Sequence, residues 1–180
     1  MSVATRSLIA FLAFASFAAS PFSGAFAQTV GVAPAQAPRY PAGAEESPTP
    51  LDGLVSGCMG RLFDAGLVTT DAREARIPAS EWESQSFGLD AAREGRVDFI
   101  VALFADWKPS AFKKGAWILS ALRYRLVRVA DGATLASGSL EGPVDSELVA
   151  KAADRSAALA GADAATACLA LLAPVSPGGK

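Results

Sequence analysis

Three consecutive strand-like segments in the middle of the chain constrain its fold more than any other feature. They span Arg96–Trp107, Ala116–Val129 and Thr134–Glu141. The dipeptide Asp131-Gly132 joins the last two, and it favours a tight hairpin because glycine accepts the positive φ that such turns need. The first segment is apolar at odd and even positions alike, which is typical of a central strand covered on both faces. We therefore predict a meander around which the other elements pack.

The second of these segments does not keep one alternation of apolar and polar residues. Leu122, Tyr124 and Leu126 share one parity, and Arg128 then falls on that same apolar parity. A bulge or a strong twist near Leu126 would reconcile the two halves of the strand. The third segment has only two bulky apolar residues set among small ones, which indicates an edge strand or a closely packed one.

Two helical regions flank the meander. The first follows Pro50, which suits the first turn of a helix, and Gly66 provides its stop. The last begins at Asp145 or Ser146, is rich in alanine, and is expected to be divided at Gly161. Between them the pattern predicts a short strand, a polar loop and a short helix, at Leu67–Thr70, Asp71–Gly88 and Leu89–Glu94. The predicted fold is α+β: a mainly antiparallel sheet of three to four strands with the first and last helices packed on it.

The amino terminus has the pattern of a secretory signal. A single early charge at Arg6 precedes the apolar run Leu8–Ala19, and Ala25-Phe26-Ala27 places small residues before a cut at Gln28. An uncleaved amino-terminal anchor is the alternative. We expect cleavage between Ala27 and Gln28, a periplasmic or secreted location, and no transmembrane segment after cleavage.

The rest of the chain divides by composition. Residues 28–49 are rich in Pro and Ala and are expected to form a disordered tether, although Val30 and Val32 alternate like a short strand at Thr29–Ala33. Residues 50–173 suit one domain that needs no metal to fold, and residues 174–180 form a disordered tail.

Two cysteines, Cys58 and Cys168, lie on apolar faces of the first and last predicted helices. In an exported chain an even and minimal cysteine count favours a disulfide. Such a bridge would close a loop of about 110 residues and stabilise the fold by up to ~4.7 kcal/mol in the chain-entropy picture. Two separate buried thiols are the alternative.

The residues that are missing exclude several chemistries. The chain has no histidine, which removes histidine-dependent triads, histidine proton shuttles and the usual zinc sites. Loss of Arg6 with the signal leaves 15 of the 16 basic residues against 18 acidic ones, and this balance argues against nucleic acid as a partner. Ser110 and Lys113 match the S-x-x-K pattern, but its companion elements are absent.

Paired carboxylates could hydrolyse glycosides without histidine. The acidic residues near aromatic ones are Glu81, Glu83, Asp90, Asp98 and Asp106, and their spacing gives no sign of convergence. No D-x-D-x-D-G run is present for calcium. We therefore predict no catalytic residues, no metal and no cofactor.

Two groups of residues are candidates for binding. Arg123, Arg125 and Arg128, extended by Lys113 and Lys114, would form a basic strip for an anionic partner, or a solvated face paired with neighbouring acids. Tryptophans at Trp82, Trp107 and Trp117 would form a contact platform, or would pack in the core. Trp107 and Trp117 end and begin adjacent strands, so that end of the sheet is the preferred contact surface.

Three stretches give the chain a resemblance to a known exported domain. They are Leu62–Gly66 leading into Leu67–Thr70, Ala91–Ile100, and Leu122–Val129 running into Asp131–Ala136. This order resembles the α+β domain of the Tol-system propeller protein's amino terminus, of penicillin-binding-protein activator lipoproteins and of the curli-secretion lipoprotein. That family opens with an apolar strand before the first helix, and here Thr29–Ala33 is the one candidate for it. The resemblance implies a non-enzymatic envelope module that docks on other proteins, and it transfers no catalytic residues.

The sequence thus predicts a non-catalytic exported envelope accessory or protein-interaction module, whose partners are other envelope proteins. A small binding domain for an anionic cell-wall or lipid component is the first alternative. A carboxylate-dependent exported hydrolase is a more distant one.

Overall fold

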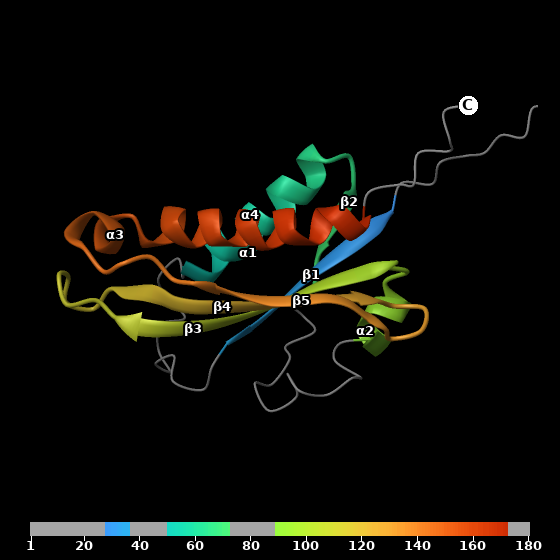
Figure 1. The fold of residues 1–180 in the computed structure, drawn as a ribbon, viewed down its shortest axis with the longest axis horizontal. Coiled ribbons are helices and arrows are strands. Elements are labelled where there is room, and N and C mark those ends of the chain that lie inside the picture. The colour runs from blue at the N-terminus through green and yellow to red at the C-terminus, as the bar shows by residue number, and fades with distance from the viewer. Residues whose placement is uncertain (1–27, 37–49, 73–88, 173–180) are drawn as a thin grey trace, which may run out of the picture.

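The computed structural model describes residues 28–36, 50–72 and 89–172. Within them a five-stranded sheet has the order β2-β1-β3-β4-β5. Helices α1 and α4 cover one face of this sheet, and α2 lies on the other side (Figure 1). The strands are β1 Thr29–Gln36, β2 Val68–Asp71, β3 Phe99–Pro109, β4 Trp117–Arg128 and β5 Thr134–Glu141. The helices are α1 Pro50–Asp64, α2 Leu89–Glu94, α3 Glu147–Lys151 and α4 Ala153–Leu172.

The predicted strand count and strand direction are wrong on the β1 side. Thr29–Gln36 forms β1, which lies between β2 and β3 and runs parallel to both, so the sheet is mixed rather than mainly antiparallel. This segment is therefore not part of a tether. Pro34 is tolerated because β2 pairs with β1 only from Thr29 to Val32, so the proline lies beyond the end of β2.

The predicted meander is confirmed. A register shift does lie next to Leu126, but it does not change the alternation of β4 as predicted. Strands β3, β4 and β5 pair antiparallel in sequence order. The β4–β5 register shifts between Leu126 and Val127, where Leu126 faces Ala136 and Val127 faces Thr134, which makes Leu135 the extra residue. A second shift, between Asp106 and Trp107 in the β3–β4 register, makes Ser120 an extra residue of β4. That second shift was not predicted.

Helices α1 and α4 pack backbone against backbone through glycines. An added Cβ would lie 2.3 Å from the Asp154 carbonyl oxygen at Gly53, and 2.0 Å from that of Ala158 at Gly57. At Gly161 it would lie 2.1 Å from the Leu54 carbonyl oxygen. Gly161 therefore does not divide the carboxy-terminal region as predicted. The break falls at Ala152, between α3 and α4.

Helix α4 is long and apolar enough to cross a membrane when length and composition are considered by themselves. In this structure its buried residues include Ala157, Gly161, Cys168 and Leu172, which face α1 and the sheet. This packing explains the apolar residues on the buried side of α4, whereas Leu159 and Leu171 are exposed.

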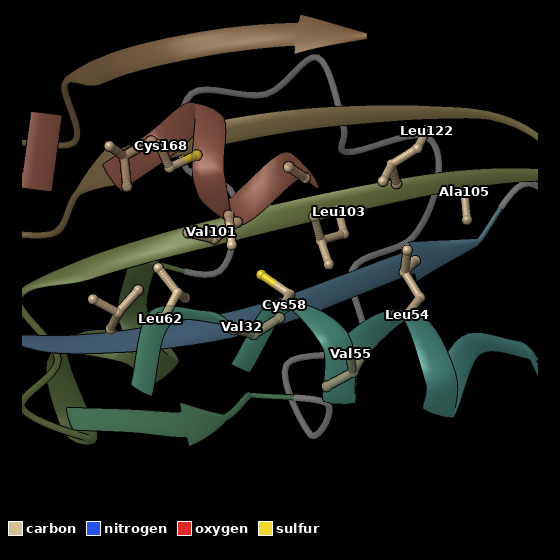
Figure 2. Close-up of a cluster of buried hydrophobic side chains, with 14 of the residues drawn as sticks. Val32, Leu54, Val55, Cys58, Leu62, Val101, Leu103, Ala105, Leu122 and Cys168 are labelled. Atoms are coloured by element: carbon tan, nitrogen blue, oxygen red, sulfur yellow. The ribbon is translucent and has the colours of Figure 1, made fainter. Parts of the chain in front are cut away.

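Apolar side chains form two clusters, one on each face of the sheet. The larger cluster lies between the sheet and helices α1 and α4, and it includes Leu54, Leu62, Leu103 and Leu122 (Figure 2). The smaller cluster lies on the opposite face and includes Ile100 and Val127, with Leu89 and Ala92 from α2. The meander therefore has apolar packing on both faces, as its first strand predicts.

Cys58 and Cys168 lie on α1 and α4 as expected, but they do not form the predicted disulfide. Both are free and buried in the larger cluster, where each side chain packs in the core (Figure 2). Burial raises the pKa of the Cys168 thiol to about 11. Burial also raises the pKa of Cys58, and the charge of an ionised Cys168 adds to that effect. Both thiols are therefore protonated at neutral pH and unreactive as nucleophiles.

Candidate functional site

The three arginines of the predicted basic strip do not share a face. Arg123 faces Phe104 across the β3–β4 ladder, and its guanidinium carbon lies 4.1 Å from the centre of the Phe104 ring. Arg125 faces Ala102 on this same side of the sheet, the side of the smaller cluster. Arg128 has the opposite parity, and its guanidinium pairs with Asp131 in the hairpin turn at 3.2 Å. The strip is therefore split into a two-arginine pair on one face and an ion-paired arginine on the other.

The tryptophans Trp107 and Trp117 lie together at one end of the sheet, on the face of α1 and α4. In the β3–β4 ladder Trp107 faces Leu119 and Trp117 faces Pro109, so the two indoles are diagonal neighbours. Trp107 is 8% exposed and belongs to the core, whereas Trp117 is half-buried against it. Trp107 thus packs in the core under this end of the sheet, on the side of α1 and α4. The third tryptophan, Trp82, lies outside the described residues.

A surface that the sequence did not single out is formed beyond this tryptophan end. We call it the hairpin tip. It consists of the β3–β4 loop, residues 110–116, the β5–α3 connection, residues 142–146, and the first turn of α3. Three of its apolar side chains project into solvent: Phe112 is 58% exposed, Val144 87% and Leu148 80%. Figure 1 shows the β3–β4 loop and α3 at the same end of the molecule.

Asp145 ties the two halves of the hairpin tip together. Its carboxylate accepts hydrogen bonds from the Ser110 hydroxyl at 2.9 Å and from the Ala111 amide at 2.8 Å. The Ser110 hydroxyl oxygen in turn accepts from the Phe112 amide at 3.1 Å. The cap of α3 is Ser146, whose hydroxyl accepts from the Val149 amide, so Asp145 is left for the loop.

The same hydrogen bonds explain the S-x-x-K pattern. Ser110 lies in a loop, as its flanking Pro109 and Gly115 indicate, and its hydroxyl donates to a carboxylate. A hydroxyl held in this way stabilises the loop and is not positioned as a nucleophile beside Lys113. The pattern is therefore structural.

The candidate carboxylates are separated. Asp90 pairs with Arg93 on α2 at 3.0 Å, and the Asp98 carboxylate accepts from the Thr29 amide at 2.8 Å. Asp106 lies on β3, and Glu81 and Glu83 lie outside the described residues. Within residues 28–36, 50–72 and 89–172, no cluster of three or more acidic or cysteine side chains could hold a metal ion, and no charged side chain is buried.

The other exposed feature is the outer edge of β5. This strand ends the sheet, and in the described part of the chain no further strand pairs with it. Its sequence, Thr134–Glu141, contains no proline and no lysine, and its single charge is at its last residue. Prolines, lysines and other charged residues commonly protect natural edge strands from pairing with another chain. Between the bulge at Leu135 and the charge at Glu141, the edge of β5 therefore carries none of these protecting residues.

The hydrogen bonds at both ends of β5 show which backbone groups face outward. Gly142 donates its N–H to the Ser120 carbonyl at 2.8 Å, and Arg128 donates to the Ala133 carbonyl at 2.9 Å. In an antiparallel ladder alternate residues bond to the same neighbour. The residues that bond to β4 are then Ala136, Gly138 and Leu140. The residues that present N–H and C=O groups at the open edge are Ser137, Ser139 and Glu141.

Tyr124 covers the centre of this strand on the helix side. Gly138 faces Tyr124 in the ladder, and a Cβ added at Gly138 would lie 2.5 Å from the Tyr124 hydroxyl oxygen. The aromatic ring lies across the glycine and takes the place of a side chain there. The ring thus packs over this face of β5, and Ser137 and Ser139 remain exposed beside it.

No protein-family model matches the chain, and no curated protein matches it either. Solved structures do match. A PelC dodecamer from Paraburkholderia phytofirmans is 17% identical, with a TM-score of 0.40, over 75% of this chain and 86% of that one.

Two further matches belong to the group that the sequence resembles. TolB from Acinetobacter baumannii is 15% identical, with a TM-score of 0.44, over 79% of this chain and 28% of TolB. The LpoB C-terminal domain from Escherichia coli is 15% identical, with a TM-score of 0.36, over 62% of this chain and 79% of that domain. The predicted resemblance is confirmed, and at these scores it extends to an α+β arrangement and to no particular function.

Proposed function

We propose that this protein is an exported, non-catalytic module of the cell envelope that binds another envelope protein through the open edge of β5. The partner adds an extended segment to the sheet as a sixth strand. Main-chain hydrogen bonds to Ser137, Ser139 and Glu141 provide affinity in this mode of recognition, and the side chains that flank the edge provide specificity.

The observation that carries this proposal is the unguarded edge itself. The seven residues of β5 before Glu141 are uncharged, and Gly138 lies under the ring of Tyr124. The opposite edge strand, β2, has only four residues and ends in Asp71. An envelope partner is supported by the secretory pattern of residues 1–27, from which we propose a periplasmic or secreted location after cleavage before Gln28.

A binding role rather than a reaction is supported by the chemistry of the described surface. Asp90, Asp98 and Ser110 are each engaged in hydrogen bonds that hold local structure. The two thiols are buried and protonated. The described residues thus supply positioned backbone and apolar surface but no nucleophile with an activating base beside it.

The test is capture of a partner by two variants at one position. Ser139→Pro removes an N–H that faces the open edge and leaves the bonds of Gly138 and Leu140 to β4 in place. Ser139→Ala keeps that N–H and serves as the matched control. We expect the unaltered chain and Ser139→Ala to capture the same protein from envelope extract, and Ser139→Pro to lose it while it unfolds at nearly the same denaturant concentration.

Equal capture by all three chains would contradict strand addition at β5. Recovery of cell-wall fragments without any protein would contradict the protein partner itself, and would favour the anionic ligand that the arginines suggested.

A further inference from the structure

The hairpin tip combines protruding apolar side chains with positive charge. Lys108, Lys113 and Lys114 are exposed on or beside the β3–β4 loop, and none of the ion pairs found among the described residues involves them. Two acids lie in the same region. Asp145 accepts hydrogen bonds from neutral donors of the loop and keeps its negative charge, and Glu147 pairs with Lys151 one turn further along α3. Residues 108–116 and 142–151 thus carry four lysines against these two acids, so the tip has a net positive charge.

The shape of the tip decides which kind of partner it fits. Phe112 projects from one loop, Val144 from a second loop and Leu148 from the first turn of α3. Val144 and Leu148 expose 87% and 80% of their surface, so they stand clear of the fold rather than line a groove. Apolar side chains that protrude separately fit a partner whose surface deforms to surround each of them. The interfacial region of a lipid bilayer is such a surface.

We propose that the hairpin tip binds the surface of an anionic lipid bilayer. Phe112, Val144 and Leu148 enter the headgroup region, and the lysines contact lipid phosphates through ammonium groups at the ends of their flexible stems. Asp145 keeps the two loops in one arrangement, so the apolar anchors reach the surface together. This site is independent of the open edge of β5, which remains available for a protein at the side of the sheet.

The test is sedimentation with lipid vesicles, using chain purified from the envelope of the expressing cell and therefore processed as the cell processes it. One vesicle set contains phosphatidylglycerol and phosphatidylethanolamine in equal parts, and the other contains phosphatidylcholine only. We expect binding to the first set, little binding to the second, and weaker binding as salt concentration rises.

Two variants at the tip probe the two contributions. Lys113→Gln combined with Lys114→Gln lowers the partition onto the anionic vesicles about 25-fold, since each lysine near such a surface contributes about fivefold. Phe112→Ser lowers it about tenfold through lost apolar insertion. The matched controls are Phe63→Ser, at a phenylalanine that is 68% exposed near the end of α1, and Arg93→Gln on α2. Both controls leave the partition unchanged.

Equal binding to both vesicle sets would overturn the proposal, as would binding that the tip variants do not reduce. Absence of binding to the anionic vesicles would overturn it too, and loss of a captured protein in the Phe112→Ser chain would then identify the tip as a protein contact. Capture through β5 is read out separately by Ser139→Pro, so failure at one surface is distinguishable from failure at the other.

Discussion

The backbone contact between α1 and α4 makes a sharp prediction about two glycines one turn apart. At Gly57 an added Cβ would lie 2.0 Å from the Ala158 carbonyl oxygen, whereas at Gly60 there is nothing within 4 Å. Both residues lie inside α1. Gly57→Ala and Gly60→Ala therefore make the same chemical change in the same helix with opposite steric consequences.

The magnitude follows from the distance. An ordinary contact begins near 3.4 Å, so accommodating the new methyl at Gly57 requires α1 and α4 to move apart by roughly 1.4 Å. A gap of that size removes much of the dispersion energy along the interface, and overpacking of this kind costs about 3 kcal/mol. Alanine regains about 1 kcal/mol of helix propensity, which leaves a net loss near ~2 kcal/mol. Gly60→Ala gains the ~1 kcal/mol with no such cost.

The assay is equilibrium denaturation followed by circular dichroism, with thermal unfolding as a second probe. We expect the two variants to differ by about 3 kcal/mol in the free energy of unfolding, which corresponds to roughly 6–12 °C in Tm. A Gly57→Ala chain as stable as Gly60→Ala would refute the backbone-to-backbone packing. A loss in Gly60→Ala as large as that in Gly57→Ala would show that glycine is needed along α1 for another reason.

Three further predictions concern the thiols, the cap of α3 and an ion pair. Unfolded thiols ionise near pH 9.0 while folded Cys168 ionises near 11, so the folded state holds more protons in that interval. This thiol should lower the stability by about 1.4 kcal/mol per pH unit. Urea unfolding at several pH values should show that Cys168→Ala removes this part of the slope and leaves the part that comes from Cys58, whose pKa burial also raises. A thiol reagent should detect two reactive thiols in the denatured chain. Detection of none would show that Cys58 and Cys168 form a disulfide after all. Ser146→Ala should cost about 1 kcal/mol of unfolding free energy through the lost cap, whereas Arg128→Ala should cost less than ~1 kcal/mol because its pair with Asp131 is about half exposed. A larger loss of unfolding free energy in Arg128→Ala than in Ser146→Ala would contradict the expectation that the helix cap contributes more than the half-exposed ion pair.

The local patterns of the sequence are sufficient for much of the fold. Strand β5 has the predicted bounds, and α1 begins at Pro50 and is followed by Gly66, whose φ of 86° requires glycine. A register shift beside Leu126 was also expected from the position of Arg128, but its extra residue lies in β5 and Arg128 keeps its parity in β4. Each of these features depends on residues close together in the sequence.

Features that depend on distant residues were missed or, like the strand at Thr29–Ala33, recognised only as an alternative. Strand β1 contains Pro34 and small residues, and its place in the sheet comes from parallel pairing with β3, about seventy residues away. Gly161 has the local appearance of a helix breaker, but its role is close approach to Leu54 of another helix. The cysteine pattern indicates that both residues are buried on neighbouring helices, but it does not reveal whether their sulfur atoms bond.

The candidate surfaces divide in the same way. The paired tryptophans at one end of the sheet were predictable, because adjacent strands place Trp107 and Trp117 near each other. The hairpin tip was not, since it depends on Asp145 reaching the Ser110 loop across the fold. Lys113 and Lys114 were the sequence feature that could have indicated a binding surface at this tip. The sequence analysis instead added them to the strip of three arginines, which the sheet divides between its two faces.

The most direct test of the central claim is residue-resolved amide hydrogen exchange along β5, in the free chain and in the complex captured from envelope extract. In the free chain we expect fast exchange at Ser137 and Ser139, whose N–H groups face the open edge, and slow exchange at Gly138 and Leu140, which bond to β4. In the complex Ser137 and Ser139 should become protected. Slow exchange of these two amides in the free chain, or continued fast exchange in the complex, would contradict strand addition at this edge.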